Sequence, residues 1–185
     1  MLVLVEPMDD ALVERARRGD AAAFEQLVVR HQAVAFRVAY VLCRDAAEAE
    51  EAAQDAFLKA FRALPRFRAG APLRPWLLTI VANEARNRAR ASGRRRGLWV
   101  RLGNEGEEGQ ASPEELVVGG ERDAALRAAI GRLDDRDREV LWLRFFADLS
   151  EAETAAALGV RPGTVKSRTS RALQRLRTQI EENAA

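Results

Sequence analysis

The chain has 185 residues, and its 30 Lys and Arg residues nearly balance 28 Asp and Glu residues, a length that suits two small domains or one moderate domain. A single cysteine, Cys43, and a single histidine, His31, exclude an intrachain disulfide and a Cys/His zinc site. Apolar runs stay well short of the roughly 20 residues of a membrane span, and MLVLVEP at the start is too short for a signal peptide. We therefore expect a cytoplasmic protein with no membrane insertion.

Two helices are expected before residue 45. The first spans about residues 9–18 and ends at Gly19, after which Asp20 can act as the N-cap of the second. Apolar residues recur along the second helix every three or four positions, which predicts an amphipathic helix. This stripe comprises Phe24, Leu27, Val28, His31, Ala35, Val38 and Leu42. A lone histidine in such a stripe is more often a packed residue than a ligand.

A third helix is expected from Asp45 to about Leu64. Asp45 and Glu48 have the spacing of a capping box, and Phe57, Phe61 and Leu64 follow one face that we expect to be core. The opposite face is mostly acidic and carries Glu48, Glu50, Glu51, Gln54, Asp55 and Lys59. This pattern fits a solvated surface or a surface that docks on a basic partner, and the sequence leaves both open.

A Pro- and Gly-rich loop, PRFRAGAPLRP, precedes the next helix. An aromatic residue between two cations, Phe67 between Arg66 and Arg68, suits the capture of an unstacked base. A plain connector between helices is the alternative.

The helix expected from about Leu73 to Arg90 has one unusual face. Its residues run from Trp76 through Thr79, Ile80, Asn83, Arg86 and Asn87 to Arg90, with no acidic side chain along the line. A core stripe does not end in amides and guanidinium groups, because burying unpaired polar groups is costly. The face therefore favours contact with nucleic acid, while Leu77, Leu78, Val81 and Ala85 pack on the other side.

Residues 92–120 are expected to form a flexible acidic linker, since they are rich in Gly, Ser and Glu and show no helical period. This divides the chain into an N-terminal helical domain, residues 1–91, and a C-terminal domain, residues 121–185. The C-terminal domain opens with a helix over about residues 121–132, which places Leu126, Ile130 and Leu133 inward. Asp134 then caps a helix in which Trp142 and Phe146 lie one turn apart. No segment alternates with the period of a strand, so the predicted class is all-α.

The segment SEAETAAALGVRPGTVKSRTSRALQRLR predicts a helix-turn-helix. Ser150 and Glu153 form a capping box, Gly159 supplies the turn and Pro162 opens a second helix. Val165, Leu173 and Leu176 are expected to face the core, and four cations, Lys166, Arg168, Arg171 and Arg175, to face outward. A helical hairpin in a plain bundle is the alternative, but it has no use for four cations on one exposed helix.

The order of these segments resembles the bacterial sigma factors of RNA polymerase, in the small extracytoplasmic-function (ECF) group. The likeness includes LDDRDREVLWLRFFADLSEAETAAALGV, and its two strongest pieces are WLLTIVANEARNR and GTVKSR. Three positions depart from the family pattern: Thr154 and Thr169 replace aliphatic residues, and Asn87 replaces an acid that many members have.

The resemblance implies roles for named residues. The third helix would dock on the clamp coiled coil of the largest polymerase subunit, through Glu48, Glu51, Gln54, Asp55 and Lys59. The minus-10 element would be bound and melted by Phe67, Arg68, Trp76, Asn83, Arg86, Asn87 and Arg90. The last helix would enter the major groove of the minus-35 element. Its contacts would come from Arg161, Thr164, Lys166, Ser167, Arg168, Ser170, Arg171 and Arg175.

The predicted function is promoter-specific initiation by binding, with no catalytic residues, cofactor or metal. The expected partners are core polymerase, including the flap of its second subunit, and promoter DNA, both duplex and single-stranded. An anti-sigma protein is expected from the family alone. The alternative is a stand-alone helix-turn-helix regulator, and a nucleic-acid enzyme ranks last, because the sequence has no carboxylate cluster with metal-site spacing or nucleophile set.

Overall fold

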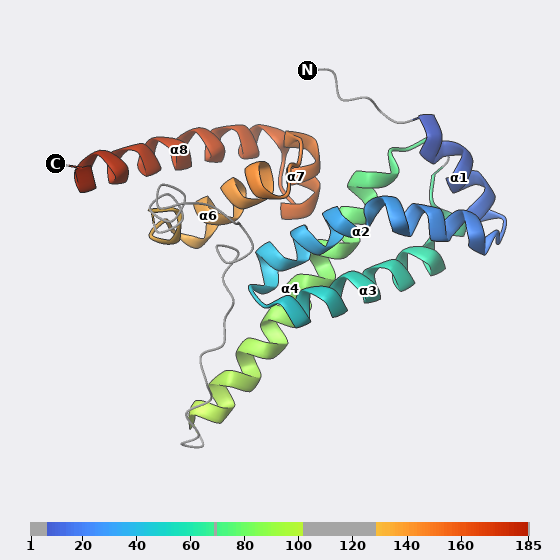
Figure 1. The fold of residues 1–185 in the computed structure, drawn as a ribbon, viewed down its shortest axis with the longest axis horizontal. Helices are drawn as coiled ribbons and strands as arrows, with labels where there is room; N and C mark the ends of the chain where they lie inside the picture. The colour runs from blue at the N-terminus through green and yellow to red at the C-terminus, as the bar shows by residue number, and fades with distance from the viewer. Residues whose placement is uncertain (1–6, 69, 102–128, 185) are drawn as a thin grey trace.

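The computed structural model describes residues 7–68, 70–101 and 129–184, and every regular element within these ranges is helical (Figure 1). The all-α prediction is confirmed. The N-terminal module consists of α1 (Pro7–Arg17), α2 (Ala21–Cys43), α3 (Ala46–Ala63), a 3-10 turn η1 (Leu64–Arg66) and α4 (Leu73–Arg101). The C-terminal module contains α6 (Asp135–Leu141), the π-helical turn η3 (Trp142–Phe146), α7 (Glu151–Leu158) and α8 (Pro162–Ala184). Among these helices none is long and apolar enough to cross a bilayer.

Helix ends in the N-terminal module follow the predicted caps. The Asp20 carboxylate accepts a hydrogen bond from the Ala23 amide at 3.0 Å and begins α2. Arg44 ends that helix in the left-handed region, with φ of 57°. Asp45 accepts from the Glu48 amide at 2.8 Å and begins α3. The Glu48 side chain accepts a 2.7 Å hydrogen bond from the Ser92 hydroxyl.

The buried face of α3 is made mostly of alanine. Ala49, Ala52, Ala56 and Ala60 are almost fully buried, as is Phe57. Small side chains let α3 approach α2 and α4 closely, so that the three helices form one packed unit. The prediction that Phe61 belongs to the core is wrong. It is 41% exposed, although its ring packs 4.9 Å from the ring of Phe24.

A second apolar cluster fixes α1 and the loop before α4. Leu12 and Val13 of α1 pack with Leu27, Leu64 and Phe67. At the edge of this cluster Asp9 pairs with Arg30 at 3.0 Å and with the buried His31 at 2.7 Å. His31 is therefore a packed residue with a partner on α1, as the sequence indicates.

Helix α4 is longer than the sequence predicts. The expected end near Arg90 is wrong, because α4 continues through residues 91–101, part of the predicted linker. Alanine and arginine favour helix in this stretch, and its two glycines, Gly93 and Gly97, each cost only about 1 kcal/mol. The bond from Ser92 to Glu48 also ties the first extra turn to α3. Residues 102–120 of the predicted linker lie outside the described residues.

The C-terminal module has its own core, built by α6, α7 and α8 around Leu133, Val140, Ala155, Val165 and Leu176. Expected core residue Leu173 is 43% exposed, because Ala172 takes the buried position on α8. Of the helix predicted over residues 121–132, the part with Leu126 lies outside the described residues. Trp142 and Phe146 pack edge to face with ring centroids 5.4 Å apart, as predicted.

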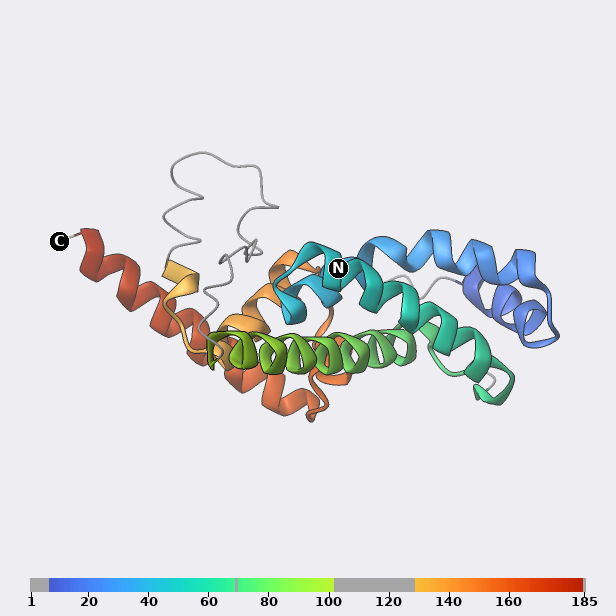
Figure 2. The ribbon, with the colours of Figure 1, turned by 90° about the horizontal axis from the view of Figure 1, so that it is seen from below.

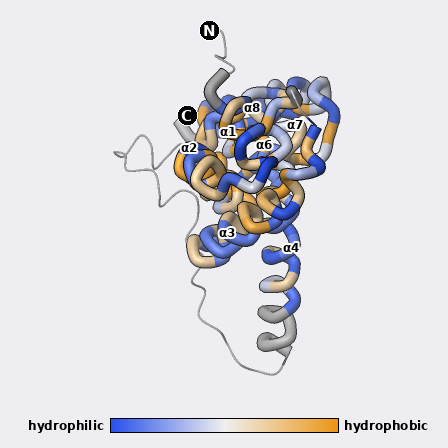
Figure 3. Tube along the Cα trace, turned by 90° about the vertical axis from the view of Figure 1, so that its right-hand side faces the viewer, coloured by the Kyte–Doolittle hydropathy of each residue, from blue (hydrophilic) through white to orange (hydrophobic). Residues whose placement is uncertain are grey.

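The two modules also share a core. Helix α7 lies along α4, and η3 packs on α2 (Figures 1 and 2). Figure 3 shows apolar segments gathered where the helices crowd together and hydrophilic residues along α4 where it leaves them. We call the junction of α7 and η3 with α2 and α4 the module contact. Its buried side chains from the C-terminal module are Trp142, Leu143, Ala147, Leu149 and Ala157.

Candidate nucleic-acid and polymerase interfaces

Helix α8 displays the cations of the predicted helix-turn-helix. Ser150 and Glu153 form a complete capping box at the start of α7, and Gly159 ends that helix with φ of 66°. Val165 is fully buried between the two helices, and this sets which face of α8 points outward. Arg161, Lys166, Ser167, Ser170 and Arg171 are exposed, while Thr164 and Arg168 are partly buried. The outward line therefore contains most of the residues assigned to the minus-35 element.

Arg175 differs from the other cations of this set. Its guanidinium pairs with Asp134 at 3.0 Å and also with Asp137, whose side chain is 8% exposed. Asp134 is the N-cap of α6. Arg175 thus fastens α8 to the start of α6, a structural role that its position in the sequence did not indicate.

The corresponding face of α4 is only partly open. Asn83, Asn87 and Arg90 are exposed, and Trp76 is partly buried. Phe67, expected to face a base, is instead 5% exposed and packs 4.7 Å from the Trp76 ring. The loop turns this aromatic ring into the α1 cluster, because Leu64 and Leu73 offer it apolar neighbours. Arg68 beside it remains exposed.

Arg86 is engaged by the C-terminal module. Its Nη2 donates a 2.6 Å hydrogen bond to the carbonyl oxygen of Ala157, in the last turn of α7. Burial lowers the pKa of Arg86, and the nearby Glu139 carboxylate opposes that shift. Burial likewise raises the pKa of Glu139, against the effect of Arg86 and Arg44. The two charges share a poorly hydrated site at the module contact.

The acidic face of α3 is bound by an arginine of α4. Arg88 pairs with Asp55 at 2.6 Å, with Glu51, and with Glu48 at 3.6 Å. Of the other predicted docking residues, Lys59 pairs with Glu84 at 2.6 Å, and exposed Gln54 donates to Glu50 at 3.4 Å. This internal network could not be found from local spacing, since Arg88 lies more than 30 residues from each acid.

An apolar residue on the same side of α3 was missed. Leu58 is 56% exposed and lies one turn beyond Gln54 and Asp55. The signal was present in the sequence, because a leucine interrupts a polar helical face there.

Cys43 is a half-buried thiol at the end of α2. Burial raises the pKa of the Cys43 thiol to about 12, so that it stays protonated at neutral pH. Over residues 7–68, 70–101 and 129–184, no group of three His, Cys, Asp or Glu side chains is placed to hold a metal ion.

A helical module with a polar, cationic face, joined to a helix-turn-helix module, defines a two-part DNA-binding protein. Comparison with known proteins identifies the family within this class. The model of Sigma-70 region 2 matches residues 27–95, and that of Sigma-70 region 4 matches residues 123–176. The chain belongs to the ECF group of RNA polymerase sigma factors, which direct the polymerase to specific promoters and help open the DNA.

Individual relatives agree with this assignment. The RNA polymerase sigma-H factor of Pseudomonas aeruginosa is 36% identical over 178 residues, covering 92% of each chain. The ECF RNA polymerase sigma-E factor of Escherichia coli is 33% identical over 183 residues, covering 94% of each.

Two solved structures are similar over most of the chain. CnrH in complex with the cytosolic domain of CnrY gives a TM-score of 0.66 at 28% identity, covering 94% of this chain and 97% of that one. RpoE in complex with the anti-sigma factor NepR, from Bartonella quintana, gives 0.63 at 28% identity, covering 85% and 96%. Both modules match sigma regions, so nothing favours a stand-alone helix-turn-helix regulator.

Proposed function

We propose that this sigma factor docks on the clamp coiled coil of the largest polymerase subunit through the outer side of α3. The support is a continuous exposed line along that helix, in which Glu51 and Gln54 lead to Leu58. A leucine exposed at the end of a charged face gives a basic helical partner an apolar anchor beside its ion pairs. The C-terminal module would bind the flap of the second subunit, and the protein would act in the cytoplasm.

The observation that carries the DNA-binding proposal is the outward line of α8. Lys166, Ser167, Ser170 and Arg171 share the side opposite the buried Val165, Ala172 and Leu176. A helix held in this way can enter a major groove, where arginine and lysine read guanine edges. Arg161, which directly precedes this helix, and Arg168 within it would bind flanking phosphates.

The face of α4 would hold the opened strand of the minus-10 element. Exposed Asn83 and Asn87 offer donors and acceptors to unpaired bases, and Arg68 and Arg90 offer charge to phosphates. Trp76 presents part of its ring at the start of this line. Base capture there would offset the few kcal/mol that unstacking costs.

We also propose an anti-sigma protein as a regulatory partner. Both similar structures are complexes of a sigma factor, one with the cytosolic domain of CnrY and one with the anti-sigma factor NepR. This chain reproduces those sigma folds across both modules, which gives such a partner comparable surfaces to bind.

Run-off transcription with purified core polymerase tests the proposal. Fragments of the native genome serve as templates, and sequencing of the transcript ends identifies shared start-site motifs. We expect defined starts only when the chain is added to core polymerase. A stand-alone regulator would instead bind duplex fragments tightly by itself and add no start sites, and that result would overturn the proposal.

A further inference from the structure

The last part of α4 is strongly cationic. Residues 85–104 contain seven arginines and no acidic residue. Arg86 and Arg88 are held by α7 and α3. Arg90 and Arg94 are exposed, and neither forms an ion pair with an acidic side chain of residues 7–68, 70–101 or 129–184. The end of α4 therefore carries charge that the described part of the fold does not neutralise.

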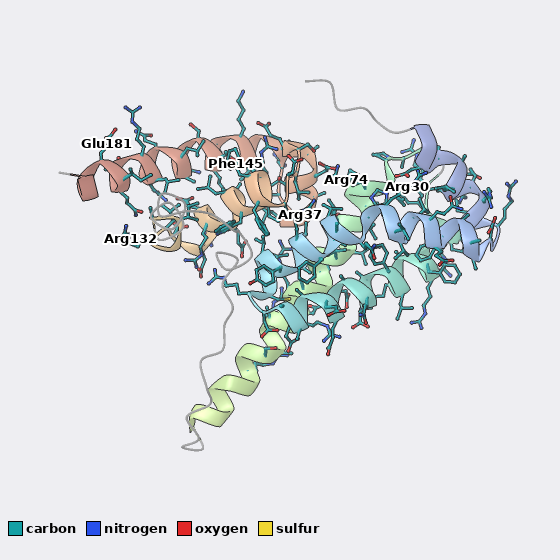
Figure 4. All side chains as sticks on the ribbon, viewed as in Figure 1. Arg30, Arg37, Arg74, Arg132, Phe145 and Glu181 are labelled. Atoms are coloured by element: carbon teal, nitrogen blue, oxygen red, sulfur yellow. The ribbon has the colours of Figure 1, made fainter. Side chains whose placement is uncertain are left out.

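This end of α4 projects from the rest of the N-terminal module. Ser92 is bonded to Glu48 of α3, and α4 then continues to Arg101, which is about 14 Å further along its axis at 1.5 Å per residue. Figure 1 shows α4 extending beyond α2 and α3. Figure 4 shows the opposite end of the helix, where Arg74 lies among its neighbours. We call residues 93–101 the projecting end, and a large partner can approach it freely.

The projecting end continues the line that would hold the opened minus-10 strand. At about 100° per residue, Asn83, Asn87, Arg90 and Arg94 stand within about 60° of one another around the helix axis. Along this line the residues change from asparagine to arginine. Amides suit the edges of unpaired bases, whereas guanidinium groups suit phosphates. The order along α4 therefore predicts base contacts first and backbone contacts beyond them.

We propose that the projecting end of α4 binds the phosphate backbone of the duplex that adjoins the opened minus-10 strand, on the side of the minus-35 element. This inference rests on the function proposed above. The chain continues from α4 into the module that would bind the minus-35 element, so the end of α4 lies on that side of the opened strand. A projecting helix of about 14 Å spans about four base pairs of duplex, at 3.4 Å each.

Duplex DNA fits this end better than a single strand or a protein surface does. A helix holds its cations in fixed positions, and a duplex presents its phosphates in fixed positions, with one charge per about 1.7 Å of axis. Single strands are captured largely by stacking on aromatic side chains, and protein partners use apolar anchors. The positions Asn83, Asn87, Arg90 and Arg94 provide neither.

The salt dependence of promoter binding by the holoenzyme, which is core polymerase with this chain, tests the contact. Each neutralised phosphate contributes about 0.9 to the slope of log affinity against log salt. Arg94→Gln should reduce this slope by about 0.9, so that the loss of affinity between 50 and 200 mM salt becomes about 3.5-fold smaller. Arg94→Lys keeps the charge and should keep the parent slope. Arg18→Gln, at an exposed site just after α1, is the matched control.

Neutral phosphates locate the contact on the DNA. A promoter fragment with methylphosphonate linkages over about four base pairs beside the opened strand lacks the charges that Arg94 would bind. We expect the parent and Arg94→Gln holoenzymes to have equal slopes on this fragment. A difference of about 0.9 that persists there would overturn the proposed position, because the arginine would then bind phosphate elsewhere.

Two changes at Gly93 test whether the helix itself is needed. A methyl group added at Gly93 would meet no atom within 4 Å, so Gly93→Ala should favour the helix and keep the parent slope. Gly93→Pro removes a backbone donor and kinks or breaks the helix, which moves Arg94 off the line. We expect Gly93→Pro to reduce the slope at least as far as Arg94→Gln does. A parent slope in the proline variant would overturn the helical contact.

The contact and the proposed function fail in different ways. If the parent chain gives core polymerase no defined start sites, the proposed function is overturned, and the contact with it. If start sites are normal and Arg94→Gln keeps the parent slope, the contact alone is overturned. Weaker binding of Arg94→Gln to core polymerase, with unchanged binding of its holoenzyme to DNA, would indicate a polymerase contact and would also overturn the proposal.

Discussion

The two helices that we propose to contact DNA, α8 and α4, carry similar residues in different states. On α8, Lys166 and Arg171 are exposed, and no acidic side chain of the described residues forms an ion pair with either. On α4, Arg74, Arg86 and Arg88 are all held by groups of other helices. The cations of a helix are therefore available to bind DNA only where no other helix of the fold pairs with them.

The difference follows from what packs beside each helix. Helix α8 lies at one edge of the molecule, and its outer side meets solvent (Figure 1). Helix α4 runs between α3, with its acids, and α7, with its C-terminal carbonyls. Substitutions on the outer side of α8 should therefore affect DNA recognition, and substitutions of the paired arginines of α4 should affect stability.

The largest effect is expected for Arg171→Ala. Loss of a good base contact costs about 1–3 kcal/mol, or roughly a 5- to 150-fold fall in promoter-specific transcription. Thermal stability and binding to core polymerase should not change, because Arg171 is exposed and, among the described residues, donates a hydrogen bond only to the Ser167 carbonyl of its own helix, at 3.3 Å. Run-off transcription and a polymerase pull-down measure the two properties. Arg177→Ala, at an 81% exposed site paired with Glu181, is the matched control. Loss of core binding in the Arg171 variant would contradict the assignment.

Arg88→Ala should reduce the stability of the fold. It leaves Glu48, Glu51 and Asp55 without their shared cation, which we expect to lower the free energy of unfolding by about 1–2 kcal/mol, because a network is worth more than one exposed pair. Urea unfolding followed by circular dichroism measures the change, with exposed Arg62→Ala as the control. A stability equal to the parent's would show that the three pairs contribute nothing.

Arg175→Ala tests whether this residue acts as a structural ion pair or as a contact to DNA phosphate. As a bond between α8 and α6, it should cost about 1 kcal/mol of stability, because it leaves the buried Asp137 unpaired. A phosphate contact would instead reduce the slope of log affinity against log salt by about 0.9. Promoter binding at several salt concentrations and urea unfolding distinguish the two. A reduced slope with unchanged stability would return Arg175 to the DNA surface.

Local chemistry explains what the sequence could predict. The caps at Asp20, Asp45, Asp134 and Ser150 each depend on groups three residues apart, and all four are present. The arrangement of the helix-turn-helix follows from the same rules. A resemblance to a known family then supplied the roles that spacing alone left open.

Contacts between residues that are distant in the sequence explain what the sequence could not predict. An alanine beside a larger apolar residue can take the buried position, as Ala172 does beside Leu173. The partners of Arg86 and Arg88 lie 71 and at least 33 residues away. No periodic pattern identifies such pairs, and so the sequence predicted a DNA face on α4 without indicating that Arg86 and Arg88 have partners within the protein.

The smallest effect concerns pH and Glu139. Burial raises the pKa of this carboxyl above its ordinary 4.5 in the folded protein, against Arg86, Arg44 and Arg138, and Asp135 adds to the rise. The folded protein therefore binds the proton more tightly than the unfolded chain. The stability that comes from this proton is fully present below pH 4.5 and is lost as pH rises through the raised value. Asp135 titrates outside this window, because Arg44 and Arg138 hold its pKa below 3.8.

Glu139→Gln removes this dependence, since an amide cannot ionise. At neutral pH the variant should be slightly more stable than the parent, because no carboxylate charge remains to be buried. Urea unfolding of both proteins from pH 7 down to about pH 5 should show the parent gaining stability relative to the variant as pH falls. A difference in stability that stays constant over this range would mean that Glu139 remains hydrated, and that Arg86 is held at the module contact by the α7 carbonyl alone.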